Sequence, residues 1–206
     1  MNFLRKFTKR DLGFAVLTGL ITGVIAWRVF GFLRIAPYHG ISWGAMVVVI
    51  PILWILGVLL GYLLGQWLNF FNQFGKFATV GFTNFAVNAA ILNILIAWTN
   101  YTAGRGYAVI ASASFIVALL SSYLWNRYWV FQGRTSQNEG GEFGKFFTVT
   151  LIAFLINVVA ASLTVNYIHP ILGLDARQWA NVASVVGSAI GLIFSFAGYR
   201  LAVFRE

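Results

Sequence analysis

Residues 43–65 read WGAMVVVIPILWILGVLLGYLLG, a run of 23 residues without a charged side chain. A helix needs about 20 consecutive, mostly apolar residues to cross the hydrocarbon core of a bilayer. A helix can cross alone because it satisfies its backbone hydrogen bonds internally. This run therefore predicts a transmembrane helix.

Apolar runs of similar length occupy most of the rest of the chain. Of the 206 residues, 60% are hydrophobic and only 9% are charged, and the mean hydropathy is +0.81. Such a composition leaves too little polar surface for a water-soluble globule. We therefore predict an all-α membrane protein with six transmembrane helices, the other five at residues 12–33, 77–98, 107–125, 146–167 and 179–198.

The positive charges follow the predicted topology. The net charge is +9, but the 14 Lys and Arg residues lie almost entirely between the apolar runs or at their ends. If the N-terminus is cytoplasmic, ten of them face the cytoplasm and four face outside, as the positive-inside rule requires. We therefore predict that both termini are cytoplasmic. The positive charges are expected to set the orientation of the chain in the membrane and to contact anionic lipids, and no nucleic-acid partner is expected. The four outer residues are Arg28, Arg34, Arg105 and Arg177.

An internal repeat divides the chain. The motif FGKF occurs at residues 74–77 and again at 143–146, and Asn88 and Asn157 have the same offset (143 − 74 = 157 − 88 = 69). Arg127 and Arg200 correspond at an offset of 73 (200 − 127). We predict a four-helix core at residues 70–206, made of two repeats at 74–131 and 143–204. Because each repeat crosses the membrane twice, the two copies are expected to be parallel.

Residues 1–66 are predicted to form a separate two-helix hairpin. They lack the FGKF motif and contain glycines at intervals of four residues, which place small residues on one helix face. Close helix packing explains this spacing better than a gating role does. The glycines are Gly19, Gly23, Gly57, Gly61 and Gly65.

Residues for conventional catalysis are scarce. The chain has no cysteine, its two histidines fall in predicted outer loops, and its five acids fall in loops or at the ends of spans. No carboxylate pair, metal-ligand spacing or phosphate-cradling glycine loop occurs. We predict a protein that is not an enzyme and that needs no metal or cofactor.

Polar side chains do occur inside the predicted spans. An Asn in hydrocarbon is costly unless its amide finds a partner, so these residues are expected to face the bundle interior. Two interpretations stay open: hydrogen bonds between helices, or a lined polar cavity, which the duplicated Asn88 and Asn157 favour. The asparagines and the threonine in this group are Thr83, Asn84, Asn88, Asn93, Asn157 and Asn181.

Four cations recur at the predicted cytoplasmic ends of the core helices: Lys76, Arg127, Lys145 and Arg200. A fixed cation at this depth suits a phosphate or phosphodiester headgroup. The alternative is anchoring at the interface by snorkelling. The two interpretations stay open for the arginines, and anchoring is favoured for the lysines.

The repeats resemble the GtrA-like membrane proteins, which are also similar to the membrane portion of some dolichol-phosphate mannose synthases. The resemblance covers about two thirds of the chain. It is carried by FGKF at 74–77 with Thr83-Asn84, by SYLWNRYWVF at 122–131, by FGKFF at 143–147 and by SFAGYRLAVF at 195–204. The second copy has Tyr199 where the first has Asn126, and residues 1–66 lie outside the resemblance.

The resemblance implies a flippase for a polyprenyl-phosphate-linked monosaccharide, used in glycosylation of a cell-surface polysaccharide in the inner membrane of a bacterium or archaeon. Membrane lipids, a membrane glycosyltransferase and a second copy of the chain are the partners it allows. The four cations would hold the lipid phosphate, and the polar residues Thr83, Asn84, Asn88, Asn126 and Asn157 would contact the sugar. Without an ATP-binding motif, transport is expected to run downhill. Two alternatives are a non-transporting scaffold that recruits the glycosyltransferase and, less favoured, an ion or solute pore, for which no selectivity sequence is present.

Overall fold

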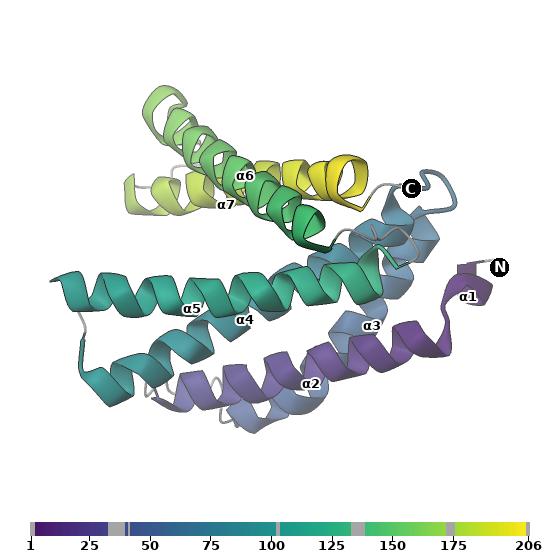
Figure 1. Ribbon diagram of the computed structural model, residues 1–206, viewed down its shortest axis with the longest axis horizontal. Helices are drawn as coiled ribbons and strands as arrows, with labels where there is room; N and C mark the ends of the chain where they lie inside the picture. The colour runs from purple at the N-terminus through teal and green to yellow at the C-terminus, as the bar shows by residue number, and fades with distance from the viewer. Residues whose placement is uncertain are drawn as a thin grey trace. The chain divides into compact units, whose positions relative to one another are not determined.

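The computed structural model describes residues 3–32, 40, 42–101, 104–132, 139–171 and 176–204. Six helices in these ranges are long and apolar enough to cross a membrane, which confirms the predicted all-α fold with six spans. Many of their large apolar side chains are exposed, for example those of Val48, Phe85 and Val109, as expected of surfaces that face lipid. The six helices are α2 (Lys9–Phe32), α3 (Met46–Leu64), α4 (Phe71–Thr99), α5 (Gly104–Trp125), α6 (Glu139–Tyr167) and α7 (Ala176–Gly198), shown in Figure 1.

α4 and α6 begin six and seven residues earlier than the apolar runs predict (77 − 71 and 146 − 139), a larger shift than in the other helices. α4 begins at Phe71, within the segment that joins the hairpin to the core, and α6 begins at Glu139, within the polar segment before the second FGKF motif. A helix can extend beyond the membrane because its backbone hydrogen bonds do not require apolar side chains. α4 ends at Thr99 and is capped by Asn100, which has a left-handed conformation (φ 56°) and donates its N–H to the carbonyl of Ile96, a common way for a helix to end.

The chain divides into two compact units, Met1–Gln132 and Gly133–Glu206. In the first unit, the hairpin helices α2 and α3 pack against each other and both pack against α4, which also packs against α5 (Figure 1). The short helix α1 (Phe3–Lys6) contacts α3. The predicted hairpin is therefore part of the same compact unit as the first predicted repeat, and the proposed division into residues 1–66 and 70–206 stays a prediction.

Glycines bring the helices of the first unit into close contact. A Cβ added at Gly61 would lie 2.9 Å from the carbonyl oxygen of Phe71, and one added at Gly75 would lie 2.9 Å from the carbonyl oxygen of Gly57. Gly19 lies against Pro51, and Gly23 against the backbone at residues 46–47. The predicted packing role is confirmed at Gly19, Gly23 and Gly61 but not at Gly57, where an added Cβ would meet no atom of the described residues within 4 Å. A hydroxyl hub adds to this packing, since Thr83 Oγ1 accepts a hydrogen bond from Trp54 Nε1 at 3.3 Å and lies 3.2 Å from Thr22 Oγ1.

The second unit consists of α6 and α7, which cross each other in Figure 1. Gly187 and Gly191 of α7 lie against the backbone of α6 near Asn157, where an added Cβ would meet atoms within about 3 Å. Larger side chains at these positions would force the two helices apart.

Both predicted repeats end in the same unusual way. α5 continues as the five-residue π-helix η3 (Asn126–Val130), and α7 continues as the five-residue π-helix η4 (Tyr199–Val203). In each unit the next residue is a fully buried phenylalanine, Phe131 or Phe204, which lies 6.5 or 6.4 Å, centroid to centroid, from the last phenylalanine of the FGKF motif. π-Helical turns are rare and often occur at functional sites. These shared endings support the predicted repeat, while the parallel symmetry of the two copies stays a prediction.

Candidate functional site

The first turn of α2 begins with a reciprocal cap between Thr8 and Asp11. The Thr8 backbone N–H and hydroxyl donate to Asp11 Oδ2 at 3.1 and 2.9 Å, and the Asp11 N–H donates to Thr8 Oγ1 at 3.1 Å. This is the capping-box arrangement, which satisfies backbone donors that a helix N-terminus leaves free. It fixes the Asp11 carboxylate at the start of the first membrane span.

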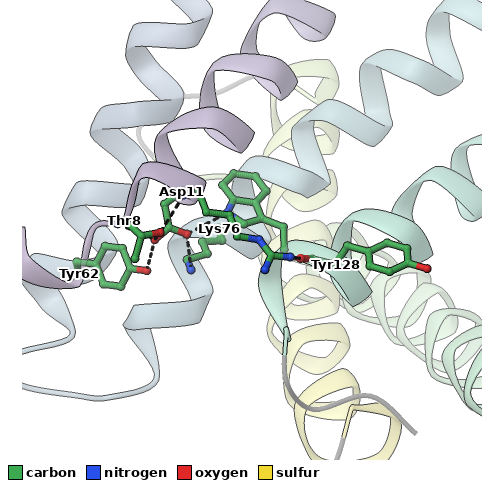
Figure 2. Close-up of polar contacts among 7 residues, drawn as sticks. Thr8, Asp11, Tyr62, Lys76 and Tyr128 are labelled. Atoms are coloured by element: carbon green, nitrogen blue, oxygen red, sulfur yellow. Dashed lines mark hydrogen bonds and ion pairs between the residues drawn. The ribbon is translucent and has the colours of Figure 1, made fainter. Parts of the chain in front are cut away.

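The same carboxylate joins three other elements of the first unit (Figure 2). Lys76 Nζ of α4 lies 2.6 Å from Asp11 Oδ1 in an ion pair. The Tyr62 hydroxyl of α3 donates to Oδ2 at 2.8 Å, and Trp129 Nε1 of η3 donates to Oδ1 at 3.1 Å. We call Thr8, Asp11, Tyr62, Lys76 and Trp129 the Asp11 network.

The ion pair at the centre of the Asp11 network is closed to solvent, whereas Thr8 at its edge is exposed. The side chains of Lys76 and Asp11 are 7% and 1% exposed, and the lysine ammonium also lies 5.3 Å from the centroid of the Tyr62 ring. Burying two charges is expensive unless they are paired and their remaining hydrogen-bonding sites are filled. The donors from Thr8, Tyr62 and Trp129 fill the sites on the carboxylate. The network therefore joins the hairpin to the first predicted repeat.

Sequence reasoning placed Asp11 at the end of a span and gave it no role. The pairing with Lys76 depends on how α2 packs against α4, which no local pattern shows. A signal was available in Thr8-x-x-Asp11, which matches a capping box at the start of an apolar run. Asp11 is also the first acid of the chain, and it follows the basic residues Arg5, Lys6, Lys9 and Arg10.

The predicted phosphate-binding cations differ in their surroundings. Lys76 belongs to the Asp11 network. Arg127 is half-buried, donates to the Tyr123 hydroxyl at 3.0 Å, and has its guanidinium carbon 5.9 and 5.7 Å from the ring centroids of Tyr123 and Tyr128. Lys145 and Arg200 belong to the second unit, where Lys145 is exposed and Arg200 is half-buried.

Four of the five predicted sugar contacts belong to the first unit. Thr83 is at the hydroxyl hub described above and donates to the Thr79 carbonyl at 2.9 Å. Asn126 is fully buried and its amide nitrogen donates to the Ser122 carbonyl at 2.8 Å, but its Oδ1 has no hydrogen-bond partner among the described residues. The same holds for Oδ1 of Asn88 and for both amide atoms of Asn84.

The fifth predicted sugar contact, Asn157, lies in α6 of the second unit, where its Nδ2 donates to Ser188 Oγ at 3.3 Å. In this unit Tyr199 stands at the position of Asn126. The Thr150 hydroxyl donates its only proton to the Phe146 carbonyl at 2.8 Å, so the Tyr199 hydroxyl is the donor in its 2.6 Å contact with Thr150 Oγ1. The Tyr199 ring also stacks on Phe146 at 4.4 Å. The Tyr199 hydroxyl therefore has a partner in the second unit, whereas Asn126 Oδ1 in the first unit has none within the described part of the chain.

These helices and their buried polar groups define a multi-pass α-helical membrane protein. The family model described as GtrA/DPMS, transmembrane domain, matches residues 76–204, more than half of the chain. The chain belongs to this family, which confirms the resemblance found from the sequence and indicates a membrane function related to polyprenyl-phosphate-linked sugars. Comparisons with curated proteins and with solved structures give no match.

Proposed function

We propose that the chain translocates a polyprenyl-phosphate-linked monosaccharide across the membrane, for glycosylation of a cell-surface polysaccharide. The observation that carries this proposal is the group of buried amide atoms of Asn84, Asn88 and Asn126 that have no partner among the described residues. Family membership supplies the class of lipid.

Unpaired buried amides call for an explanation, because each buried donor or acceptor left unsatisfied costs about 1–3 kcal/mol. Asn84 and Asn88 are four residues apart and so lie on one face of α4. Sugar hydroxyls both donate and accept hydrogen bonds, so a passing sugar would satisfy these amides. Hydrogen bonds to a transient ligand explain why the protein itself does not fill them.

The phosphate would be held by the cations at the predicted cytoplasmic ends of the helices. Arg127 offers a planar guanidinium, which suits phosphate. Lys76 would bind the phosphate by exchanging one anionic partner, the Asp11 carboxylate, for another. Lys145 and Arg200 would supply the corresponding cations in the second unit.

The proposed setting is the inner membrane of a bacterium or archaeon, with both termini in the cytoplasm, where a membrane glycosyltransferase would load the lipid. The chain would not catalyse a reaction. With no ATP-binding motif in the sequence, transport would run downhill and be drawn by use of the sugar outside.

A translocation assay tests the role of the amides. The full chain is reconstituted in liposomes that carry a polyprenyl-phosphate sugar, and the rate of its appearance in the opposite leaflet is measured for the wild type, Asn84→Leu and Asn88→Leu. We expect both variants to lose most of the activity while remaining folded, since the two amide atoms of Asn84 and Oδ1 of Asn88 make no hydrogen bond with the described residues. Asn166→Leu is the matched control, because Asn166 is exposed and its amide donates to the Ser162 carbonyl.

Wild-type rates in both variants would contradict the role of the amides, and a wild-type rate in Arg127→Gln would contradict its contact with phosphate. If the wild type does not translocate the lipid and a glycosyltransferase co-purifies with it, the proposal of transport is rejected in favour of the scaffold function.

A further inference from the structure

A cavity of about 650 Å³ lies between α2 and α4 of the first unit. Its size is typical of small-molecule sites, which span about 300–1,000 Å³. α2 and α4 lie side by side in Figure 1. The cavity is lined by residues 24, 25, 27–29, 31 and 32 of α2 and residues 90, 93, 94 and 97 of α4.

The lining is amphipathic. It contains one charged residue, Arg28, and one amide, Asn93, and the rest is apolar apart from the indole nitrogen of Trp27. The Arg28 guanidinium carbon lies 5.9 Å from the centroid of the Trp27 ring. Asn93 Nδ2 donates to the Ala89 carbonyl at 2.7 Å, which fixes the orientation of its amide. An arginine and an amide in an otherwise apolar cavity suit a ligand with a phosphate group and a hydrocarbon chain.

The cavity and the Asp11 network lie toward opposite ends of one helix. Asp11 and Arg28 are 17 residues apart in α2 (28 − 11), which at 1.5 Å per residue is about 26 Å. The hydrocarbon core is about 30 Å thick. Arg28 is therefore placed near the membrane face opposite the Asp11 network, at the depth where a lipid phosphate lies beside the hydrocarbon.

We propose that this cavity binds the phosphate group of a lipid at that face, with Arg28 on the phosphate, Asn93 on the polar headgroup, and the chain against the apolar lining. The identification of the lipid as a polyprenyl phosphate rests on the proposed function. α2 lies outside the residues matched by the family model, so the site gives the hairpin a role of its own: it supplies the cation that receives the lipid after it crosses.

Binding is tested on the full chain in nanodiscs of phosphatidylcholine, titrated with farnesyl phosphate, with native mass spectrometry to count bound ligands. Loss of a charged hydrogen-bonding partner is expected to weaken binding of farnesyl phosphate about tenfold or more in Arg28→Gln. Asn93→Leu should weaken it less, because the charge remains. Arg105→Gln is the matched control, since Arg105 is exposed, is predicted to lie on the same side of the membrane, and does not line the cavity.

Two competitors identify the source of the phosphate. Inorganic phosphate and phosphatidylglycerol are each added against bound farnesyl phosphate. Weak competition by both supports a site for prenyl phosphate. Displacement by inorganic phosphate at the same concentration would overturn the lipid assignment, and so would equal displacement by phosphatidylglycerol. Wild-type affinity in Arg28→Gln would overturn the site itself.

Failure of this inference is distinguishable from failure of the proposed function. Binding that depends on Arg28, in a protein that does not translocate in liposomes, would retain the site and reject transport. If the protein translocates the lipid but Arg28→Gln does not change binding, transport is retained and the site at Arg28 is rejected.

Discussion

The two segments that the sequence pairs as repeats share their endings but differ in how their polar groups are satisfied. Lys76 is buried in an ion pair with Asp11 of the hairpin, whereas the corresponding Lys145 is exposed. Asn126 Oδ1 has no hydrogen-bond partner among the described residues, whereas Tyr199 at the same position donates to Thr150. Residues at equivalent positions of the two repeats can therefore have different partners, because the first repeat packs against the hairpin and its lysine pairs with a hairpin carboxylate.

The largest loss of stability is expected when the ion pair between Asp11 and Lys76 is broken. Lys76→Met leaves the Asp11 carboxylate buried without its cation, which should lower the free energy of unfolding by about 3–5 kcal/mol. Lys145→Met should change it by no more than about 0.5 kcal/mol, because Lys145 is exposed. Both are measured by equilibrium unfolding in mixed micelles of dodecyl maltoside and sodium dodecyl sulfate.

A double replacement sharpens this comparison. Asp11→Leu combined with Lys76→Met removes both charges, so most of the lost stability should return. Equal effects of Lys76→Met and Lys145→Met would show that the hairpin does not distinguish the two segments.

A smaller effect is expected from Trp129→Phe, which removes the indole donor to Asp11 Oδ1. A hydrogen bond to a charged group contributes about 1.5–3 kcal/mol to stability. Trp98→Phe is the matched control, since Trp98 is one of the exposed aromatic residues. The loss caused by Trp129→Phe should shrink when Asp11 is already leucine, and an undiminished loss would assign the effect to packing of the ring.

The smallest loss of stability is expected from a substitution in the second segment. Tyr199→Phe removes a donor to Thr150 but leaves the stacked ring and the Thr150 bond to the Phe146 carbonyl in place. The expected loss in the free energy of unfolding is about 0.5–1.5 kcal/mol. Tyr167→Phe, at an exposed tyrosine of the same unit, serves as its control. A loss as large as that of Lys76→Met would mean that the second segment also depends on a buried polar contact.

The six spans could be predicted from sequence because a bilayer imposes one length and one composition on every crossing helix. The early starts of α4 and α6 could not, since the hydropathy of a sequence marks the edge of the membrane and not the end of a helix. The four-residue spacing of glycines predicted the close contacts at Gly19, Gly23 and Gly61, but it could not show that a Cβ at Gly57 would meet no atom of the described residues within 4 Å.

The candidate site was harder to predict. Polar residues at membrane depth could be recognised in the sequence, but their partners are set by packing between helices that are distant in the chain. Lys76 was therefore identified as a cation, but its carboxylate partner was not. Asn84 and Asn88 were identified as polar, but the sequence did not show that both amide atoms of Asn84 and Oδ1 of Asn88 lack a hydrogen-bond partner among the described residues. The cavity at Arg28 was missed for the same reason, because its two walls come from α2 and α4.

The Asp11–Lys76 pair also bears on the order of synthesis. Asp11 and its cap Thr8 are made about 65 residues before Lys76 (76 − 11). The family match begins at residue 76 itself, so the matched segment contains Lys76 but not its partner Asp11. We expect α2 and α3 to be in the membrane before α4, so that α4 packs against them and pairs Lys76 with Asp11 as it inserts.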